Sequence, residues 1–320
     1  MLKIGMVGTG GISQSHRDAW ANIPEARVAA VCDVRPEMAQ AAAAETGARV
    51  YTDVDEMLAA ETLDALDICL PTYLHADCAV KGLEHGLHVV CEKPISLNRA
   101  DISRIYETAK KHDRRFMVAQ VLRFWREYAA LREAIETGKY GRLLSGTMSR
   151  LGNAPKRSWN NWMHEPTQSG LVPYDLHIHD LDFLVGALGR PAAIQCHRAR
   201  DGRQDYFNVI YTYPDCFVAA EAAWFSCDYP FQAGYRFQFQ NAVMEYRAHV
   251  LITHLANGEK QVLGPEAPIA VRGVALTSTD AYYNELRYFT DCVLAQKPCD
   301  LVRPEELEAV LDIIDEINRS

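Results

Sequence analysis

A glycine-rich turn near the start of the chain constrains the fold more than any other sequence feature. Gly8-Thr9-Gly10-Gly11-Ile12-Ser13 follows the apolar run 3–7 and precedes a helical pattern. In this context Gly8 permits a tight turn, and Gly10 lets a pyrophosphate group approach the backbone at a helix N-terminus. The turn therefore predicts a dinucleotide-binding strand-turn-helix unit.

Two charged residues after the second apolar run bear on the choice of dinucleotide. Asp33 follows the run 28–32, where a carboxylate accepts hydrogen bonds from the adenosine ribose and repels a 2′-phosphate. Arg35 argues the other way, because a nearby guanidinium accommodates that phosphate. The alternative is that the glycines form an ordinary turn and Asp33 caps the next helix. We expect NAD, with NADP less favoured.

The hydropathy pattern divides the chain into two halves. Up to about residue 121, short apolar runs alternate with helical patterns such as 36–46 and 98–112, which predicts βαβ units and a doubly wound parallel sheet. After Phe124 a helix to about residue 137 is followed by long alternating runs, which predict a mostly antiparallel sheet. These runs are 143–151, 194–200, 206–213, 216–225 and 235–246, and two helices, 282–295 and 304–317, end the chain. At roughly 150 residues per domain, we expect a Rossmann domain over 1–121 and a second α/β domain over 122–320.

Composition excludes several classes of protein. The formal net charge of −9 and the lack of a Lys/Arg run interleaved with aromatic residues argue against nucleic acid as a partner. No apolar stretch approaches the roughly 20 residues of a membrane helix, and the first residues enter the glycine-rich turn directly, so we expect a cytoplasmic protein. The nine cysteines include no C-x-x-C pair, which argues against disulfides and a zinc knuckle. Cys32, Cys69 and Cys91 are expected to be buried.

Two short motifs follow apolar runs of the first half. Cys91-Glu92-Lys93-Pro94 should place Lys93 at the carboxyl edge of the sheet, where doubly wound folds bind ligands. The alternative for Lys93 is an ordinary solvated lysine. Leu70-Pro71-Thr72-Tyr73-Leu74-His75 ends another run at the same edge, which favours the functional interpretation.

A helical motif in the second half carries carboxylates and histidines at helical spacing. If Pro173 begins a helix, Asp175, His179 and Asp182 share one face. A carboxylate one turn before a histidine can orient the imidazole as a general base. His177 and His179 could instead form a metal pair, but residues two apart on a helix point in different directions, so we expect no metal.

Taken together, these motifs resemble the Gfo/Idh/MocA oxidoreductases, the family of glucose-fructose oxidoreductase and inositol dehydrogenase. The turn from Gly8, the 70–75 segment, Glu92-Lys93-Pro94 and the 175–182 helix occur in the family's order and approximate spacing. The resemblance implies a Rossmann domain, then an α/β domain with a large open-faced sheet, and an active site between them. It also implies cofactor contacts from Gly8, Thr9, Gly10, Gly11, Ile12, Asp33, Arg35, Leu70, Pro71, His75, Glu92, Lys93 and Gln120.

The same resemblance implies a catalytic set. Lys93 matches the lysine that hydrogen-bonds the reacting hydroxyl, and Asp175 and His179 match the acid and the proton-handling histidine. His177 stands where many members have glycine, and Leu171 and Pro173 depart from a glycine-rich lead-in, which puts the shape of the substrate pocket in doubt. Further candidates for the substrate site are Arg123, Trp159, Trp162 and Tyr283, although the two tryptophans fit an ordinary core role better.

The function that follows is an NAD-dependent dehydrogenase acting on a secondary alcohol of a sugar, inositol or related polyol. One alternative is a non-catalytic NAD-binding regulator, against which the retained Lys93, Asp175 and His179 argue. Another is a hydrolase or epimerase that keeps NAD bound through a redox cycle. Runs such as 216–225 and 235–246 are apolar on both alternations, which predicts a homodimer or homotetramer.

Overall fold

The chain forms two compact units in the computed structural model, which describes residues 1–156, 158–264, 268–271, 274–277 and 280–319. Unit 1 comprises Met1–Phe124 and Glu266–Leu307, and unit 2 comprises Trp125–Pro265 and Glu308–Ser320. The first boundary lies close to the expected one after residue 121. The return of residues 266–307 to unit 1 means that the chain passes between the units more than once.

Unit 1 is built on a six-stranded parallel sheet with the order β3-β2-β1-β4-β5-β6. Neighbouring strands pair in parallel throughout. The strand order reverses between β1 and β4, and doubly wound folds bind ligands outside the carboxyl ends of the strands at such a point. The predicted Rossmann fold is therefore confirmed. The strands are β1 (Leu2–Val7), β2 (Ala26–Cys32), β3 (Arg49–Tyr51), β4 (Ala65–Ile68), β5 (His88–Glu92) and β6 (Phe116–Ala119).

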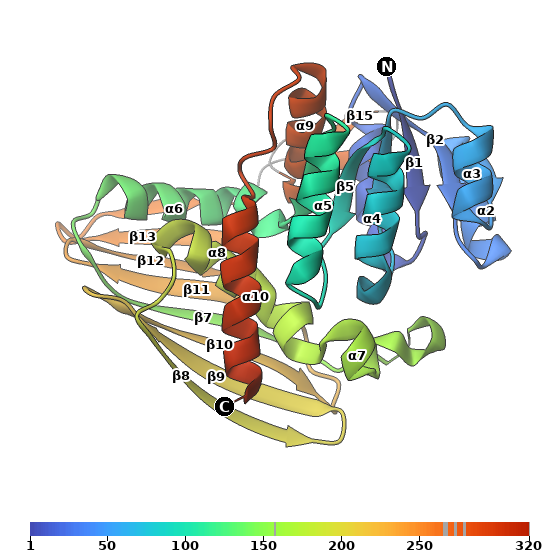
Figure 1. Cartoon of the computed structure of the whole chain (residues 1–320). Coiled ribbons are helices and arrows are strands. Elements are labelled where there is room, and N and C mark those ends of the chain that lie inside the picture. The colour runs from blue at the N-terminus through green and yellow to red at the C-terminus, as the bar shows by residue number, and fades with distance from the viewer. Residues whose placement is uncertain (157, 265–267, 272–273, 278–279, 320) are drawn as a thin grey trace. The chain divides into compact units, whose positions relative to one another are not determined.

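Helices cover both faces of this sheet. α4 (His75–Glu84) and α5 (Ala100–Lys111) lie side by side, as Figure 1 shows. α1 (Gly11–Ala21), α2 (Pro36–Thr46) and α3 (Val54–Ala60) complete the βαβ crossovers. α2 has the predicted bounds because Pro36 occupies its first turn and Gly47 ends it in a left-handed conformation. The short pair β3 and α3 is not visible in the hydropathy pattern.

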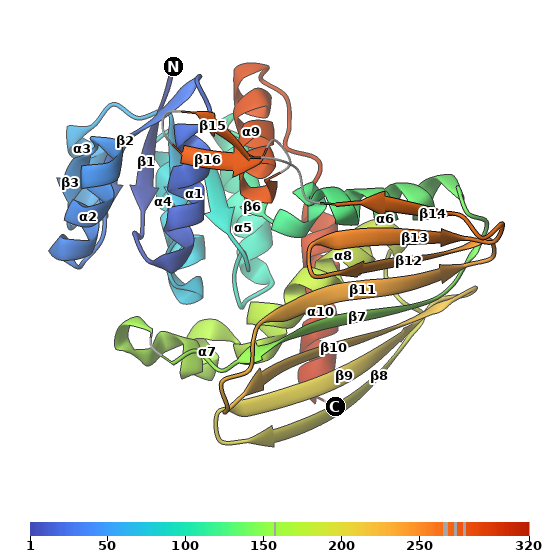
Figure 2. The same cartoon turned by 180° about the vertical axis from the view of Figure 1, so that it is seen from behind.

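The returning segment completes unit 1 with one helix and a small hairpin. α9 (Ala281–Leu294) packs on α1, and the hairpin β15 (Pro268–Val271) and β16 (Val274–Thr277) lies beside them (Figure 2). Leu286 and Phe289 of α9 share a buried core with Trp20 and Ile23. α1, which opens at the glycine-rich turn, is thus held by apolar packing on α9 as well as by the sheet.

Unit 2 is built on an eight-stranded sheet with the order β14-β13-β12-β11-β7-β10-β9-β8. Only β7 and β10 pair in parallel, so the predicted mostly antiparallel sheet is confirmed. The expected single run 235–246 is wrong, because it is a hairpin of two strands that turns at Gln240 and Asn241. The strands are β7 (Leu143–Asn153), β8 (Ala193–Asp201), β9 (Gln204–Thr212), β10 (Phe217–Phe225), β11 (Gln232–Phe239), β12 (Ala242–Arg247), β13 (Val250–Leu255) and β14 (Lys260–Leu263).

One face of this sheet is covered by helices. Figure 1 shows α6 (Arg126–Thr137), α8 (Ile178–Leu188) and α10 (Pro304–Arg319) on that face, with the short α7 (Pro166–Ser169) nearby. Figure 2 shows the opposite face, over which no helix lies in the described part of unit 2. Alternate residues of β9, including Phe207, Val209 and Tyr211, are fully buried. None of the described helices is long and apolar enough to cross a membrane.

Candidate functional site: a dinucleotide-binding edge and a polar helix

The glycine-rich turn between β1 and α1 forms an open backbone cradle. Gly8 has φ +87°, and a Cβ atom there would lie 2.5 Å from the carbonyl oxygen of Cys69, so this position requires glycine. A Cβ added at Gly10 or Gly11 would meet no atom within 4 Å. α1 begins at Gly11 with no side-chain cap, which leaves its first N–H groups directed at this open space.

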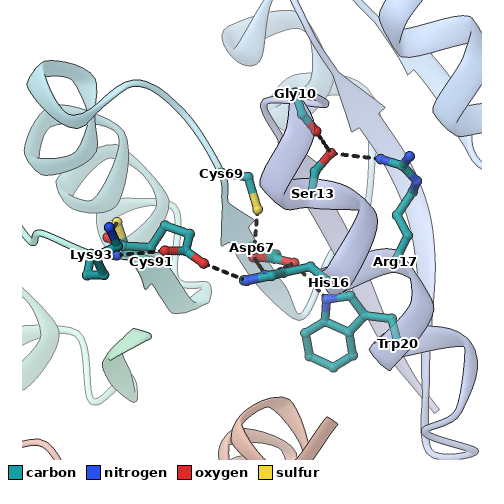
Figure 3. A network of polar contacts seen from close by, with 10 residues as sticks. Gly10, Ser13, His16, Arg17, Trp20, Asp67, Cys69, Cys91 and Lys93 are labelled. Carbon is teal, nitrogen blue, oxygen red and sulfur yellow. Dashed lines mark hydrogen bonds and ion pairs between the residues drawn. The ribbon is translucent and has the colours of Figure 1, made fainter. Parts of the chain in front are cut away.

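Ser13 closes the turn from within the helix. Its hydroxyl donates to the carbonyl oxygen of Gly10 at 2.6 Å and accepts from Arg17 at 2.7 Å, as Figure 3 shows. Arg17 in turn forms an ion pair with Glu45 at 2.9 Å. The serine that stands in place of a third glycine therefore fixes the turn by hydrogen bonding.

Asp33 lies directly after β2 and is joined to the turn. Its carboxylate accepts from the Thr9 backbone N–H at 2.9 Å and from the Thr9 hydroxyl at 3.1 Å. Arg35 donates to both carboxylate oxygens at 3.0 Å. Burial opposes ionisation of Asp33, but the hydrogen bonds from Arg35 and Thr9 outweigh it and lower the pKa. Asp33 is therefore an ionised acceptor at the expected ribose position, and Arg35 is held against it.

The segment after β4 is tied to the segment after β5 by one histidine. His75, which begins α4 after the turn η1 (Thr72–Leu74), is 1% exposed. Its Nδ1 lies 2.7 Å from the carbonyl oxygen of Pro94, and its Nε2 lies 2.7 Å from that of Leu70. Burial lowers the pKa of His75, although both carbonyl groups favour its charged form. His75 thus lies between the Leu70 and Pro94 carbonyl groups, and in its neutral form it donates a hydrogen bond to one of the two.

Glu92, Lys93 and Gln120 lie at the carboxyl ends of β5 and β6. Glu92 is the last residue of β5, and Lys93 follows it in a half-buried position. Gln120 follows β6 and is 1% exposed, and its amide nitrogen has no hydrogen-bond partner among the described residues. The expected cofactor residues therefore occur along one edge of the unit 1 sheet.

This edge fits a dinucleotide on its own geometry. The open space at Gly10 and Gly11 and the uncapped start of α1 suit a pyrophosphate group. The ionised Asp33 at the end of β2 suits a ribose. The Gln120 amide adds a buried donor, without a partner among the described residues, at the far end of the same edge.

The helical motif of unit 2 departs from a regular α-helix. Pro173–His177 forms a π-helical turn, η4, and α8 begins after it at Ile178. Asp175 and His179 are half-buried, while Asp182 is 1% exposed. The expectation that all three share one helix face rests on regular α-helical spacing, which the π-helical turn interrupts, so it stays a prediction. π-helical turns are rare and often occur at functional sites.

Two polar contacts fix this helix on its sheet. His177 is fully buried, with Nε2 2.5 Å from the Tyr211 hydroxyl of β9. Asp180 is fully buried and forms an ion pair with Arg150 of β7 at 2.7 Å. His177 therefore faces the sheet through its Nε2 atom.

The expected substrate residues occupy different environments. Arg123, in the turn η2 (Val121–Phe124), donates to the carbonyl oxygen of Leu301 at 2.6 Å and pairs with Glu306 within unit 1. Tyr283 of α9 packs partly buried on the unit 1 core. Trp159 and Trp162 lie in the turn η3 (Trp159–His164) of unit 2, in which no residue is buried, so they are not core residues. A role for these four in substrate binding stays a prediction.

Sequence reasoning missed a buried polar group in unit 1. His16, Asp67 and Cys69 place their potential ligand atoms within 4.8 Å of one another. Figure 3 shows that these side chains already bond to each other and to Trp20. The available signal was Asp67 within the apolar run 65–68, because a carboxylate buried in a parallel strand requires partners.

Comparison with known proteins agrees with this architecture of a Rossmann unit and an open-faced α/β unit. The family described as "Oxidoreductase family, NAD-binding Rossmann fold" matches residues 2–120, and the Gfo/Idh/MocA C-terminal domain matches residues 128–242. The chain belongs to the Gfo/Idh/MocA family of NAD-binding oxidoreductases.

Individual relatives cover the chain in part. A 2,7-anhydro-N-acetylneuraminate hydratase of Mediterraneibacter gnavus is 32% identical over 57% of this chain and 49% of its own length. An inositol 2-dehydrogenase of Rhizobium meliloti is 32% identical over 65% of this chain and 63% of its own length. The chain thus spans about half to two thirds of the length of these relatives. A levoglucosan dehydrogenase, solved with NADH and levoglucosan, shares the fold with a TM-score of 0.85 at 19% identity, over 100% of this chain and 96% of its own.

Proposed function

We propose that the protein is an NAD-dependent dehydrogenase that transfers a hydride between nicotinamide and a secondary alcohol of a sugar, inositol or related polyol. The observation that carries this proposal is Lys93, half-buried at the carboxyl end of β5, at the sheet edge that also bears the Gly8–Gly11 cradle. The similarity to an inositol 2-dehydrogenase supports the substrate class. The half-buried pair Asp175 and His179 supplies the proton chemistry.

The choice of NAD over NADP rests on Asp33. Its carboxylate is ionised and lies at the end of β2, where it accepts from ribose hydroxyls and repels a 2′-phosphate. Arg35 is engaged by both oxygens of that carboxylate, so binding a 2′-phosphate would require breaking this ion pair. The paired arrangement favours NAD.

Each proposed catalytic residue has one task. The Gly8–Gly11 turn and Asp33 would hold NAD, which would supply the hydride acceptor for the reaction. Lys93 donates a hydrogen bond to the reacting hydroxyl and stabilises the developing alkoxide charge. His179 accepts the hydroxyl proton as general base. Asp175 orients the His179 imidazole and stabilises it once it is protonated.

The test is NADH formation by the purified protein on a panel of inositols, sugars, anhydrosugars and sugar acids. With the best substrate, His179→Asn and Lys93→Met should each lower kcat by on the order of 10² to 10⁴, the usual share of general acid–base catalysis, and leave NAD affinity nearly unchanged. Asp175→Asn should cost less if it only orients His179. Near wild-type turnover in both His179→Asn and Lys93→Met would contradict the assignment.

A second candidate is a reaction in which NAD oxidises and then re-reduces the substrate within one turnover. The similarity to a protein named as a hydratase favours keeping this candidate. Such an enzyme converts substrate without net NADH, whereas a dehydrogenase produces NADH in equal amount with product. A regulator that only binds NAD would do neither.

Assembly follows from the second sheet. The face without covering helices in the described part of unit 2 carries half-exposed side chains such as Ile210 and Ala219, and Phe217 is 50% exposed. An antiparallel sheet that leaves such positions on one face is suited to pairing with another subunit. We therefore propose a homodimer or homotetramer.

A further inference from the structure

A buried hydrogen-bonded network connects α1 to the strand end that carries Lys93 (Figure 3). His16 of α1 places Nδ1 2.9 and 3.0 Å from the two carboxylate oxygens of Asp67 on β4. Its Nε2 lies 3.0 Å from Oε1 of Glu92, the last residue of β5. The side chains of His16 and Asp67 are fully buried, and that of Glu92 is 8% exposed.

The geometry defines the charge of the histidine. Both ring nitrogens face carboxylate oxygens. An ionised carboxylate can accept a hydrogen bond but cannot donate one, so both ring nitrogens must carry a proton, as they do only in the imidazolium. Burial opposes this charge, but attraction to Asp67 and the hydrogen bond with it raise the pKa of His16 well above its ordinary 6.5. One buried cation therefore lies between two carboxylates.

Trp20, Cys69 and Tyr282 also lie close to this group of charges. Trp20 Nε1 donates to Asp67 at 2.7 Å from the same helix. The Cys69 thiol after β4 lies 3.6 Å from Asp67, and burial raises its pKa to about 12, so it stays protonated. From α9, the Tyr282 ring lies 6.0 Å from the His16 ring between centroids. His16 therefore supplies the cation that faces Glu92 from α1.

Glu92 links this cation to Lys93. Its second oxygen, Oε2, accepts the backbone N–H of Lys93 at 3.1 Å. The Glu92 carboxylate is thus fixed at one oxygen by His16 and fixes the Lys93 backbone with the other. Losing His16 would leave two buried carboxylates without their cation, and Oε1 of Glu92 would lose the contact that fixes it.

We propose that His16 is a positioning residue: as a buried cation it holds the Glu92 carboxylate, and Glu92 holds the backbone at Lys93, so that the lysine ammonium is presented to the substrate hydroxyl. The proposal rests on the proposed function of Lys93. In this proposal the fully buried His16 acts through Glu92 and does not itself contact the substrate. Its loss should therefore affect turnover more than substrate binding.

The matched variants are His16→Asn and Trp20→Phe. His16→Asn removes the cation between Asp67 and Glu92. Trp20→Phe removes one hydrogen bond to the same Asp67 and leaves the His16–Glu92 contact in place. Both substitutions trim a buried side chain of α1, so thermal melting and NAD titration calorimetry establish that each variant folds and binds.

Two readouts test the link. Hydrogen exchange at the Lys93 backbone amide, followed by mass spectrometry or NMR, should be at least tenfold faster in His16→Asn and within threefold of wild type in Trp20→Phe. With the best panel substrate, His16→Asn should lower kcat at least tenfold while KM and the NAD dissociation constant stay within threefold. Because His16 acts through Glu92, His16→Asn/Glu92→Gln should be no more than threefold below the worse single variant.

The outcomes separate this proposal from the proposed function. Unchanged Lys93 exchange in His16→Asn overturns the link, whether or not any substrate is found. Faster exchange at Lys93 with unchanged kcat overturns the proposal that His16 affects turnover. A double variant whose loss of kcat equals the product of the two single-variant losses overturns it as well. If no panel member yields NADH, the proposed function fails, and the exchange result alone decides whether His16 holds Glu92. If His16→Asn does not fold, Glu92→Gln must show the same loss of amide protection and of kcat, and retention of both overturns the proposal.

Discussion

Acid should destabilise unit 2 through a single buried histidine, His177. Its imidazole is fully buried against Phe207 and Tyr211, with ring centroids 4.8 and 5.9 Å away. Nε2 lies 2.5 Å from the Tyr211 hydroxyl, and Nδ1 has no hydrogen-bond partner among the described residues. Protonation would create a buried cation with one N–H lacking an acceptor, near the Arg150 guanidinium. Burial and Arg150 accordingly lower the pKa of His177 to about 3.

The size of the effect follows from linkage. An unfolded histidine has a pKa of about 6.5, so below that pH the unfolded chain binds a proton that the folded chain refuses. The contribution of His177 to stability is present above pH 6.5 and is lost as the pH falls toward 3. At about 1.4 kcal/mol per pH unit, the loss is roughly 2 kcal/mol at pH 5 and several kcal/mol at pH 3.

The measurement is denaturant unfolding of wild type and His177→Gln between pH 7.5 and 5. The glutamine side chain of this variant is neutral throughout, so the variant, less stable at pH 7.5, should gain about 2 kcal/mol relative to wild type by pH 5. His197→Gln, at an exposed position of β8 in the same unit, should parallel wild type. A difference between His177→Gln and wild type that stays constant within about 0.5 kcal/mol, well below the 2 kcal/mol expected, would refute the reasoning.

Three further predictions concern the cofactor, the sheet and the assembly. Asp33→Ser should release Arg35 and shift the ratio of NAD to NADP affinity toward NADP by roughly 10- to 100-fold, the worth of a charged hydrogen bond; tighter binding of NADP by wild type in the same titrations would contradict the NAD assignment. Arg150→Met should lower the free energy of unfolding by about 3 to 5 kcal/mol, because it leaves the buried Asp180 without its cation, while Arg150→Met/Asp180→Leu should recover most of this loss in denaturant unfolding. Light scattering should give a multiple of the 35.9 kDa chain mass, and a monomer at micromolar concentration would remove the argument from the uncovered sheet face.

The fold of unit 1 was largely predictable because its signals are local. A tight turn at Gly8, a proline at the start of α2 and short apolar runs each specify structure within a few residues. The packing of α9 on α1 depends instead on Leu286 and Phe289, which lie far along the chain from Trp20 and Ile23. Nothing in the local pattern of 282–295 distinguishes a helix of unit 2 from one of unit 1.

The polar networks were less predictable than the strands. The hydropathy pattern placed β4 correctly but gave no partner for Asp67. Its two partners, His16 and Trp20, lie one turn apart on α1, far from β4 in the sequence. The hairpin at Gln240 and Asn241 was missed because the turn itself carries no glycine or proline. The available signal was a change of phase, since the buried positions are Tyr235, Phe237 and Phe239 before the turn and Ala242, Met244 and Tyr246 after it. Periodicity reports which side chains face the core and leaves their pairing open.

The polar helix of unit 2 shows how pairing bears on function. Spacing in the sequence allows several of its acids and histidines to be the functional ones, since Asp175, His177, His179, Asp180 and Asp182 all lie close together along the helix. The structure assigns two of them to the sheet, where His177 contacts Tyr211 and Asp180 pairs with Arg150. These contacts fix the rotation of α8 and leave Asp175 and His179 as half-buried positions across the π-helical turn. By facing the sheet, His177 and Asp180 therefore determine which residues of this helix, Asp175 and His179, we propose to handle the proton.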